Sequence, residues 1–184
     1  MRIIDPDHKN SAILKFKPLG DESELLIDGH AIKDFVNDYI GGRLENFLKT
    51  QKDPKTPATM KLPILALNTE TFKDLLKDET DKDIFIFFAG PACFSCSTVW
   101  PDFEKVARVL HEKSENLIFA FVDLSHNELQ EEAKIYAFPT IRLYLAETDR
   151  KYTWIGYQDN TRYSDLYAFL TKNTKKAKIV EDKA

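Results

Sequence analysis

Cys93 and Cys96 are the residues of this sequence whose type and spacing most directly suggest chemistry. They are the two cysteines of the chain and form a Cys-x-x-Cys pair in the stretch FFAGPACFSCSTVWPDF, residues 87–103. Such a pair can exchange disulfides with other thiols, contribute ligands to a zinc site, or be two unrelated buried thiols. The strand and helix predicted on either side of the pair help to choose among these three interpretations.

The pair lies between a predicted strand and a predicted helix. The run DIFIFFAG at 83–90 is nearly continuously apolar, as expected of a central strand covered on both faces. Val99, Phe103, Val106 and Leu110 then mark one side of a helix. Helix N-termini stabilise negative charge, and thiol pKa values in motifs so placed fall from about 8.5 to roughly 3.5–7.5. We therefore expect Cys93 to be the exposed nucleophile and Cys96, one turn deeper, to attack the mixed disulfide.

A zinc site normally needs four ligands, and the four histidines of the chain show no ligand spacing; they are His8, His30, His111 and His126. We expect neither a metal nor a cofactor. Zinc binding and a chance pair of thiols remain alternatives, but Cys-x-x-Cys near a βαβ pattern favours a redox pair.

The remaining elements alternate along the chain. Periodicity predicts strands at 62–67, 117–124, 140–146 and 152–157, and helices at 68–78, 125–136 and 161–172. The last of these strands should pair antiparallel because a short turn joins it to the strand before it, whereas the early βαβ units imply parallel pairing. The prediction is an α/β domain with a mixed central sheet and helices on both faces.

Residues 62–173 form this predicted domain. Residues 1–50 read as strand, strand and helix, which bury too little to fold well alone. Residues 51–61 are polar with two prolines and are interpreted as a linker. Residues 174–184 are expected to be a charged, flexible tail.

Composition excludes some functions. The chain of 184 residues is 43% hydrophobic, with a net charge of −4 and no basic face, so nucleic acid is not the expected partner. Its apolar runs are too short for membrane insertion. No signal peptide is recognised, and the final EDKA is not a Lys-Asp-Glu-Leu retrieval motif.

Three features together resemble a thioredoxin-fold domain: the Cys93–Cys96 pair at its strand-to-helix junction, Pro101, and Phe-Pro-Thr at 138–140. More narrowly, DKDIFIFFAGPACFSC at 81–96 is similar to DKDVFVEFYAPWCGHC in the last catalytic domain of protein disulfide isomerases. Residues 32–51 resemble the helix that closes their preceding non-catalytic domain. The resemblance implies a thioredoxin-like fold preceded by a partial second thioredoxin-like domain.

The resemblance also implies a function. The chain would be a thiol–disulfide oxidoreductase or isomerase of the endoplasmic reticulum lumen, acting on unfolded or misoxidised polypeptides with glutathione or another thiol as redox partner. Family likeness makes Pro139 a cis proline that faces the cysteines and helps to hold substrate. Client peptides would bind over Pro91, Phe94, Phe138 and Pro139.

The motif departs from the family near the first cysteine. Ala92 replaces tryptophan, and Phe94-Ser95 replaces the usual inner Gly-His pair. Ser97 and Thr98 stand where two lysines often follow the second cysteine. Serine donates only a neutral hydrogen bond and the positive charges are gone, so Cys93 should be less acidic than its family counterpart.

The most consequential departure is Phe87. Six residues before the first cysteine, the family keeps a buried glutamate that moves the proton of the second cysteine. Arg162 lies within one position of the family's mobile arginine and is either a tuning residue or a solvated helix-start residue. We therefore expect disulfide exchange that is slower and less oxidising than at Cys-Gly-His-Cys. The alternative is a chaperone-like binding module beside a static disulfide.

Overall fold

The computed structural model describes residues 2–7, 12–19, 28–44, 46–57, 63–79, 81–129, 133, 135–150, 153–157, 161–177 and 179. The chain divides into two compact units, Met1–Leu48 and Lys49–Ala184.

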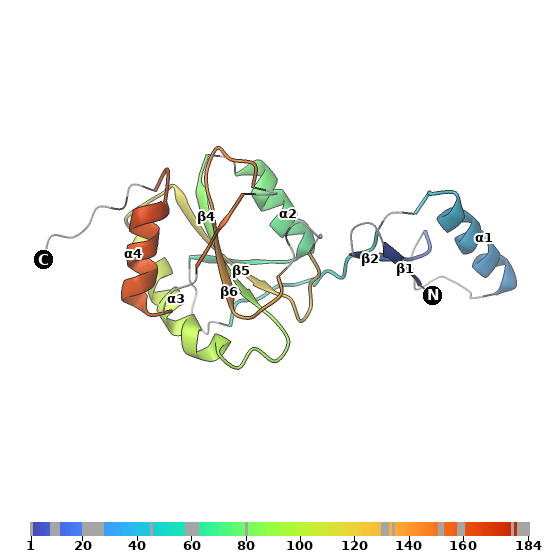
Figure 1. The fold of residues 1–184 in the computed structure, drawn as a ribbon, viewed down its shortest axis with the longest axis horizontal. Helices are drawn as coiled ribbons and strands as arrows, with labels where there is room; N and C mark the ends of the chain where they lie inside the picture. The colour runs from blue at the N-terminus through green and yellow to red at the C-terminus, as the bar shows by residue number, and fades with distance from the viewer. Residues whose placement is uncertain are drawn as a thin grey trace, which may run out of the picture. The chain divides into compact units, whose positions relative to one another are not determined.

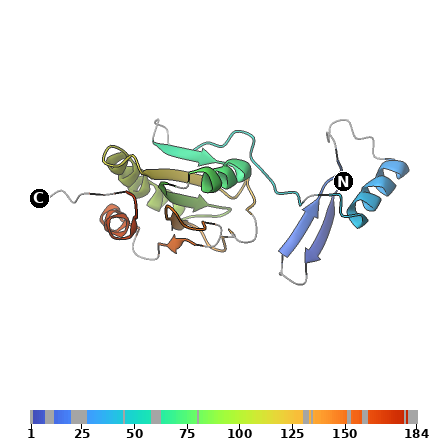
Figure 2. The same cartoon turned by 90° about the horizontal axis from the view of Figure 1, so that it is seen from above.

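The first unit is a hairpin with one helix (Figure 2). Strands β1 (Ile3–Asp7) and β2 (Ala12–Phe16) pair antiparallel. Helix α1 (Gly29–Ile40) is capped at its start by Asp28, whose side chain accepts hydrogen bonds from the backbone N–H groups of His30 and Ala31. It ends at Gly41. The ring of Tyr39 on α1 packs edge-on against Phe16, with centroids 5.1 Å apart.

The second unit is built on a five-stranded sheet in the order β3-β5-β4-β6-β7. Its strands are β3 (Ile64–Leu67), β4 (Asp83–Ala89), β5 (Leu117–Asp123), β6 (Thr140–Tyr144) and β7 (Ile155–Gly156). Strands β3, β5 and β4 run parallel, whereas β4–β6 and β6–β7 pair antiparallel. The predicted mixed sheet is confirmed.

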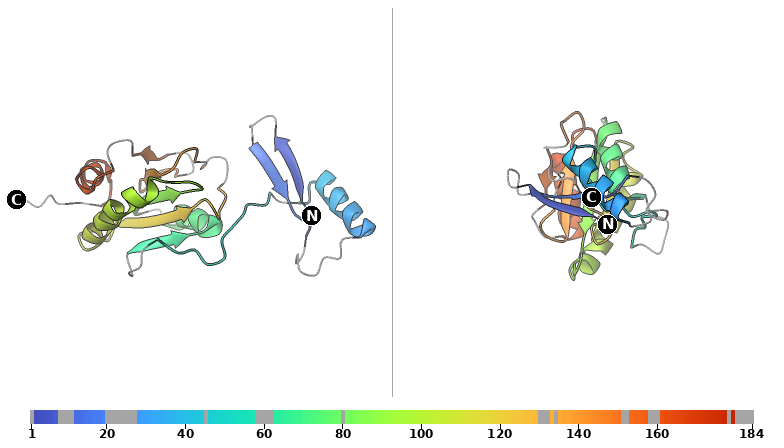
Figure 3. Two further views of the ribbon diagram at one scale, coloured as in Figure 1. Left: turned by 90° about the horizontal axis from the view of Figure 1, so that it is seen from below. Right: turned by 90° about the vertical axis from the view of Figure 1, so that its right-hand side faces the viewer.

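Helices cover both faces of this sheet (Figures 1 and 3). Helix α2 (Thr69–Asp78) lies on one face, and α3 (Cys96–His111) and α4 (Tyr163–Asn173) lie together on the other. Alternate residues of β4 therefore enter two separate hydrophobic clusters, Phe85 and Phe87 toward α3 and Phe88 toward α2. Burial on both faces explains why the strand is apolar at every position from Ile84 to Phe88.

The predicted helix at 125–136 is wrong over its first part, because residues 125–129 are not helical. Ala133 lies in a 3₁₀ turn, and residues 130–132 and 134 lie outside the described residues. Ser125 and Glu128 stand at capping-box positions, where the Glu128 side chain would pair with the backbone N–H of Ser125. Both groups bind elsewhere: the backbone N–H of Ser125 donates to Asp123 Oδ1 at 2.8 Å, and Glu128 Oε2 accepts from the backbone N–H of Lys49 at 3.0 Å. Tertiary hydrogen bonds have replaced the local ones that would begin a helix.

A buried amide anchors this segment. Asn127 is 2% exposed, and its Oδ1 accepts from the backbone N–H groups of Gln51 and Thr69 at 2.8 and 3.2 Å. Its Nδ2 donates to the carbonyl of Asp123 at 2.9 Å. The chain entering the second unit, the start of α2 and the end of β5 are thereby joined at one side chain.

A buried carboxylate anchors the other end of the unit. Asp83 Oδ2 accepts from the backbone N–H groups of Lys175, Lys176 and Ala177, and its Oδ1 accepts from that of Ala146. The first residues of segment 174–184 are thus tied to the start of β4.

Asn127→Ala should lower the free energy of unfolding by about 2–3 kcal/mol, because two backbone donors and one acceptor lose a buried partner. The measurement is urea unfolding followed by circular dichroism. His126→Ala, at the exposed neighbouring position, is the matched control and should change stability by less than about 0.5 kcal/mol. Equal effects of the two substitutions would refute the anchoring role.

Candidate functional site

Strand β4 and helix α3 place the two cysteines. Beyond Ala89 the chain leaves the sheet, and α3 begins at Cys96. Cys93 and Cys96 form a disulfide with their Cα atoms 5.4 Å apart, and the backbone N–H of Cys96 donates to the carbonyl of Cys93 at 3.3 Å. Ala92, with φ of 56°, turns the chain into this loop in a left-handed conformation. The pair lies at the predicted strand-to-helix junction.

The inner cysteine packs against an aromatic cluster. Cys96 is half-buried against the side chains between the sheet and α3. Phe87 is fully buried there, with its ring centroid 5.5 Å from Trp100, 5.3 Å from Phe103 and 6.2 Å from Phe121. Hydrocarbon therefore fills the place where the resemblance would put a proton-transferring glutamate.

A second loop approaches the cysteine loop. The Phe138–Pro139 peptide bond is cis, as the resemblance implies. A Cβ atom at Gly90 would overlap the ring of Phe138, so this ring lies directly against the backbone three residues before Cys93. The glycine is needed at this position because two segments approach closely.

The end of β5 lies beside the end of β4. Ala89 pairs with Asp123 in the parallel register, and the backbone N–H of Leu124 donates to the carbonyl of Ala89 at 2.8 Å. His126 Nε2 lies 4.0 Å from Asp123 Oδ2. The segment anchored by Asn127 therefore continues directly from the strand end that supports the cysteine loop.

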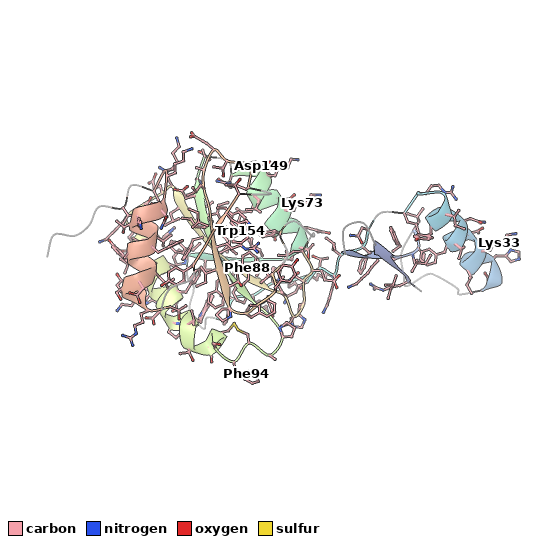
Figure 4. The ribbon with its side chains drawn as sticks, viewed as in Figure 1. Lys33, Lys73, Phe88, Phe94, Asp149 and Trp154 are labelled. Carbon is pink, nitrogen blue, oxygen red and sulfur yellow. A yellow bond between two sulfur atoms is a disulfide. The ribbon has the colours of Figure 1, made fainter. Side chains whose placement is uncertain are left out.

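Apolar side chains are exposed around the disulfide. Phe94, between the cysteines, is 89% exposed and projects outward (Figure 4). Pro91 is exposed, and Phe138 and Pro139 are half-buried. Tyr136, two residues before Phe138, is 81% exposed and was missed by the sequence analysis. Pro91 and Phe94 adjoin the cysteines in the chain and supply apolar surface next to the disulfide, and the ring of Phe138 reaches the same loop at Gly90.

Ser95 and Arg162 stand at helix starts. Ser95 precedes α3 and Arg162 precedes α4, and neither side chain makes a capping hydrogen bond. Both are exposed. Their tuning roles stay predictions.

Among the residues that the structure describes, no three His, Cys, Asp or Glu side chains gather as a metal site. No helix of the described segments is long and apolar enough to cross a membrane.

Comparison with known proteins gives consistent matches. Residues 63–172 match the thioredoxin family. The chain is 32% identical over 169 residues to a protein disulfide-isomerase of Humicola insolens. The aligned segment covers 90% of this chain and 31% of that protein. The chain is also 28% identical over 165 residues to protein disulfide-isomerase A3 of Gallus gallus, covering 89% of this chain and 31% of that protein. The crystal structure of human ERp44 matches 62% of this chain and 30% of its own, at 22% identity and a TM-score of 0.48. The chain thus spans 31% of the length of these two sequence relatives.

Gly90→Ala should destabilise the second unit by about 1–3 kcal/mol, because the added methyl group must displace the Phe138 ring. Phe138→Ala removes that ring, so the penalty for Gly90→Ala should largely vanish in the Phe138→Ala background. A double-mutant cycle of unfolding free energies measures this coupling. Additive effects would show that the two residues are not in contact.

Proposed function

The chain belongs to the thioredoxin family, and on this basis we propose that Cys93 and Cys96 exchange disulfides with unfolded or misoxidised polypeptides. The observation that carries the proposal is the disulfide between them, which lies at the amino end of α3 beside exposed apolar side chains. Since the chain spans only 31% of its relatives' length, the activity of the whole protein belongs to the proposal as well.

The disulfide state supports oxidation of a client dithiol. A client thiolate attacks Cys93 Sγ, the Cys93–Cys96 bond breaks, and Cys96 leaves as a thiolate. A second client thiolate then attacks the client sulfur of the mixed disulfide, and Cys93 leaves. The client gains a disulfide and the site holds two thiols, which glutathione disulfide or another disulfide partner reoxidises. Read in reverse, the same steps reduce or rearrange client disulfides.

Both cysteines are half-buried, but Cys96, the first residue of α3, packs against the core cluster, so attack falls on Cys93 in the loop before the helix. Clients would bind over Pro91, Phe94, Phe138 and Pro139. The exposure of Phe94 and Tyr136 supports this, since hydrophobic segments of unfolded chains bury apolar area there.

Exchange should be slow and weakly oxidising. Phe87 offers no carboxylate to move the proton of Cys96, and Ser95 offers no positive charge beside Cys93. The likeness to protein disulfide isomerases supports the endoplasmic reticulum lumen as the location.

The domain organisation is part of the proposal. We infer that residues 1–50 are the end of a second thioredoxin-like domain. Ile32, Val36 and Ile40 follow one another at four-residue spacing on α1 and are 45%, 39% and 75% exposed. A helix that exposes such a stripe normally packs it against further elements of its own domain. Residues 51–61 and 174–184 would be the linker and tail of the domain at 62–173.

A second candidate function is a chaperone-like binding module. The same exposed Phe94 and the hydrocarbon around Cys96 favour it, because both would suit a disulfide that never opens. Redox behaviour separates the two functions.

Equilibration with glutathione tests the function directly. The protein is incubated in buffers of graded reduced and oxidised glutathione, alkylated, and weighed by mass spectrometry. We expect both thiol states to be populated, at a potential more reducing than about −180 mV, which is typical of protein disulfide isomerase. A pair that stays in one state across the physiological range would contradict exchange and favour the binding module.

Phe87→Glu should speed release of a client from a Cys93 mixed disulfide by about tenfold or more, because a carboxylate near Cys96 can accept its proton. Phe87→Leu is the control that loosens the cluster without adding a base, and it should leave the rate near that of the unmodified protein. Quenched-flow alkylation measures release, and circular dichroism checks folding. Equal rates for the two variants would show that proton transfer at Cys96 is not limiting.

A further inference from the structure

The indole N–H of Trp100 is a buried donor without a visible role. Trp100 is 7% exposed, and its Nε1 has no hydrogen-bond partner among the described residues. Buried polar groups in folded proteins are nearly always paired, and an exception calls for an explanation such as strain or a redox or catalytic role.

Aromatic rings surround this indole. Its centroid lies 5.5 Å from Phe87, 5.7 Å from Phe103 and 5.2 Å from Phe121. None of these three side chains carries a lone-pair acceptor. The edge-on rings of Phe87 and Phe121 therefore offer the nitrogen at most a weak N–H···π contact.

Cys96 is the reactive neighbour on the same helix. It precedes Trp100 by four residues on α3, a spacing that puts both side chains on one face of the helix. Helical side chains lean toward the N-terminus, so the indole leans over the turn that carries Cys96. Cys96 also packs against the same buried cluster.

We propose that the Trp100 indole N–H donates a hydrogen bond to the sulfur of Cys96 once the Cys93–Cys96 bond opens. The inference rests on the proposed function, in which Cys96 leaves as a thiolate when a client attacks Cys93. A disulfide sulfur is a poor acceptor, whereas a thiolate is charged and accepts a stronger bond. The donor is thus unpaired in the disulfide and paired in the open site.

This contact would partly replace what the motif lacks. Neither Phe87 nor Ser95 brings charge to the cysteines, so a neutral N–H donor stabilises the leaving thiolate instead. The indole holds no proton for exchange, so it favours opening without serving as an acid or base.

Fluorescence of Trp100 tests the contact. The chain has two tryptophans, and Trp154 lies over Arg142, 3.8 Å from its guanidinium carbon. Trp154→Phe leaves Trp100 as the single tryptophan, and excitation at a wavelength that the seven tyrosines do not absorb selects its emission. In the reduced protein, its emission should change with pH in one step that Cys96→Ser abolishes. Emission that does not follow the ionisation of Cys96 would overturn the proposal.

Trp100→Phe keeps a ring but removes the donor. Measured at a pH above the Cys96 step seen by fluorescence, where the thiolate is populated, its equilibrium constant with glutathione should shift by about tenfold toward the disulfide, the size expected for a hydrogen bond to a charged group. Trp154→Phe, the matched aromatic control, should shift it by less than about twofold. A Trp100→Phe constant within twofold of the unmodified protein would overturn the proposal.

The two readouts separate this inference from the proposed function. If clients are not oxidised although the fluorescence step is present, the proposed function fails and the contact stands. If clients are oxidised but neither readout responds, the contact is wrong and the function stands.

Discussion

The burial of β4 on both faces is the constraint on which the rest of the second unit depends. Every side chain between Ile84 and Phe88 is fully enclosed, so each position is decided by packing, including the one beneath Cys96. A carboxylate at Phe87 would have to be buried without a partner, which is costly. The aromatic ring stabilises the sheet against α3 while removing a group that could take the proton of Cys96. Stability of the fold and speed of the chemistry oppose each other at this position.

Backbone hydrogen bonds then hold the loops around the disulfide. The side chain of Asn127 joins the chain at Gln51 to the start of α2 and the end of β5. Three residues earlier, the backbone N–H of Leu124 donates to the carbonyl of Ala89 at the end of β4. On the other side, Gly90 lets Phe138 lie against the cysteine loop. The site therefore lies where three segments meet, with Phe94 as its exposed apolar side chain.

Much of this was predictable because it depends on local pattern. Apolar periodicity predicts the strands, and the resemblance to protein disulfide isomerases is confirmed by the thioredoxin match at 63–172 and by the isomerases of Humicola insolens and Gallus gallus. The helix expected from Ser125 failed because Glu128 binds Lys49, which lies 79 residues away in sequence and sends no local signal. Trp100 was overlooked for a similar reason: its spacing reads as core, and only the structure shows that its N–H has no partner among the described residues.

The central proposal is that Phe87 cannot take the proton of Cys96, so solvent takes it. The most direct measurement is the pH dependence of client release from a Cys93 mixed disulfide in the unmodified protein. The account predicts a rate that rises about tenfold per pH unit through neutrality, because the thiolate fraction alone limits attack. A rate that is flat with pH below neutrality would reveal an internal proton acceptor and contradict the account.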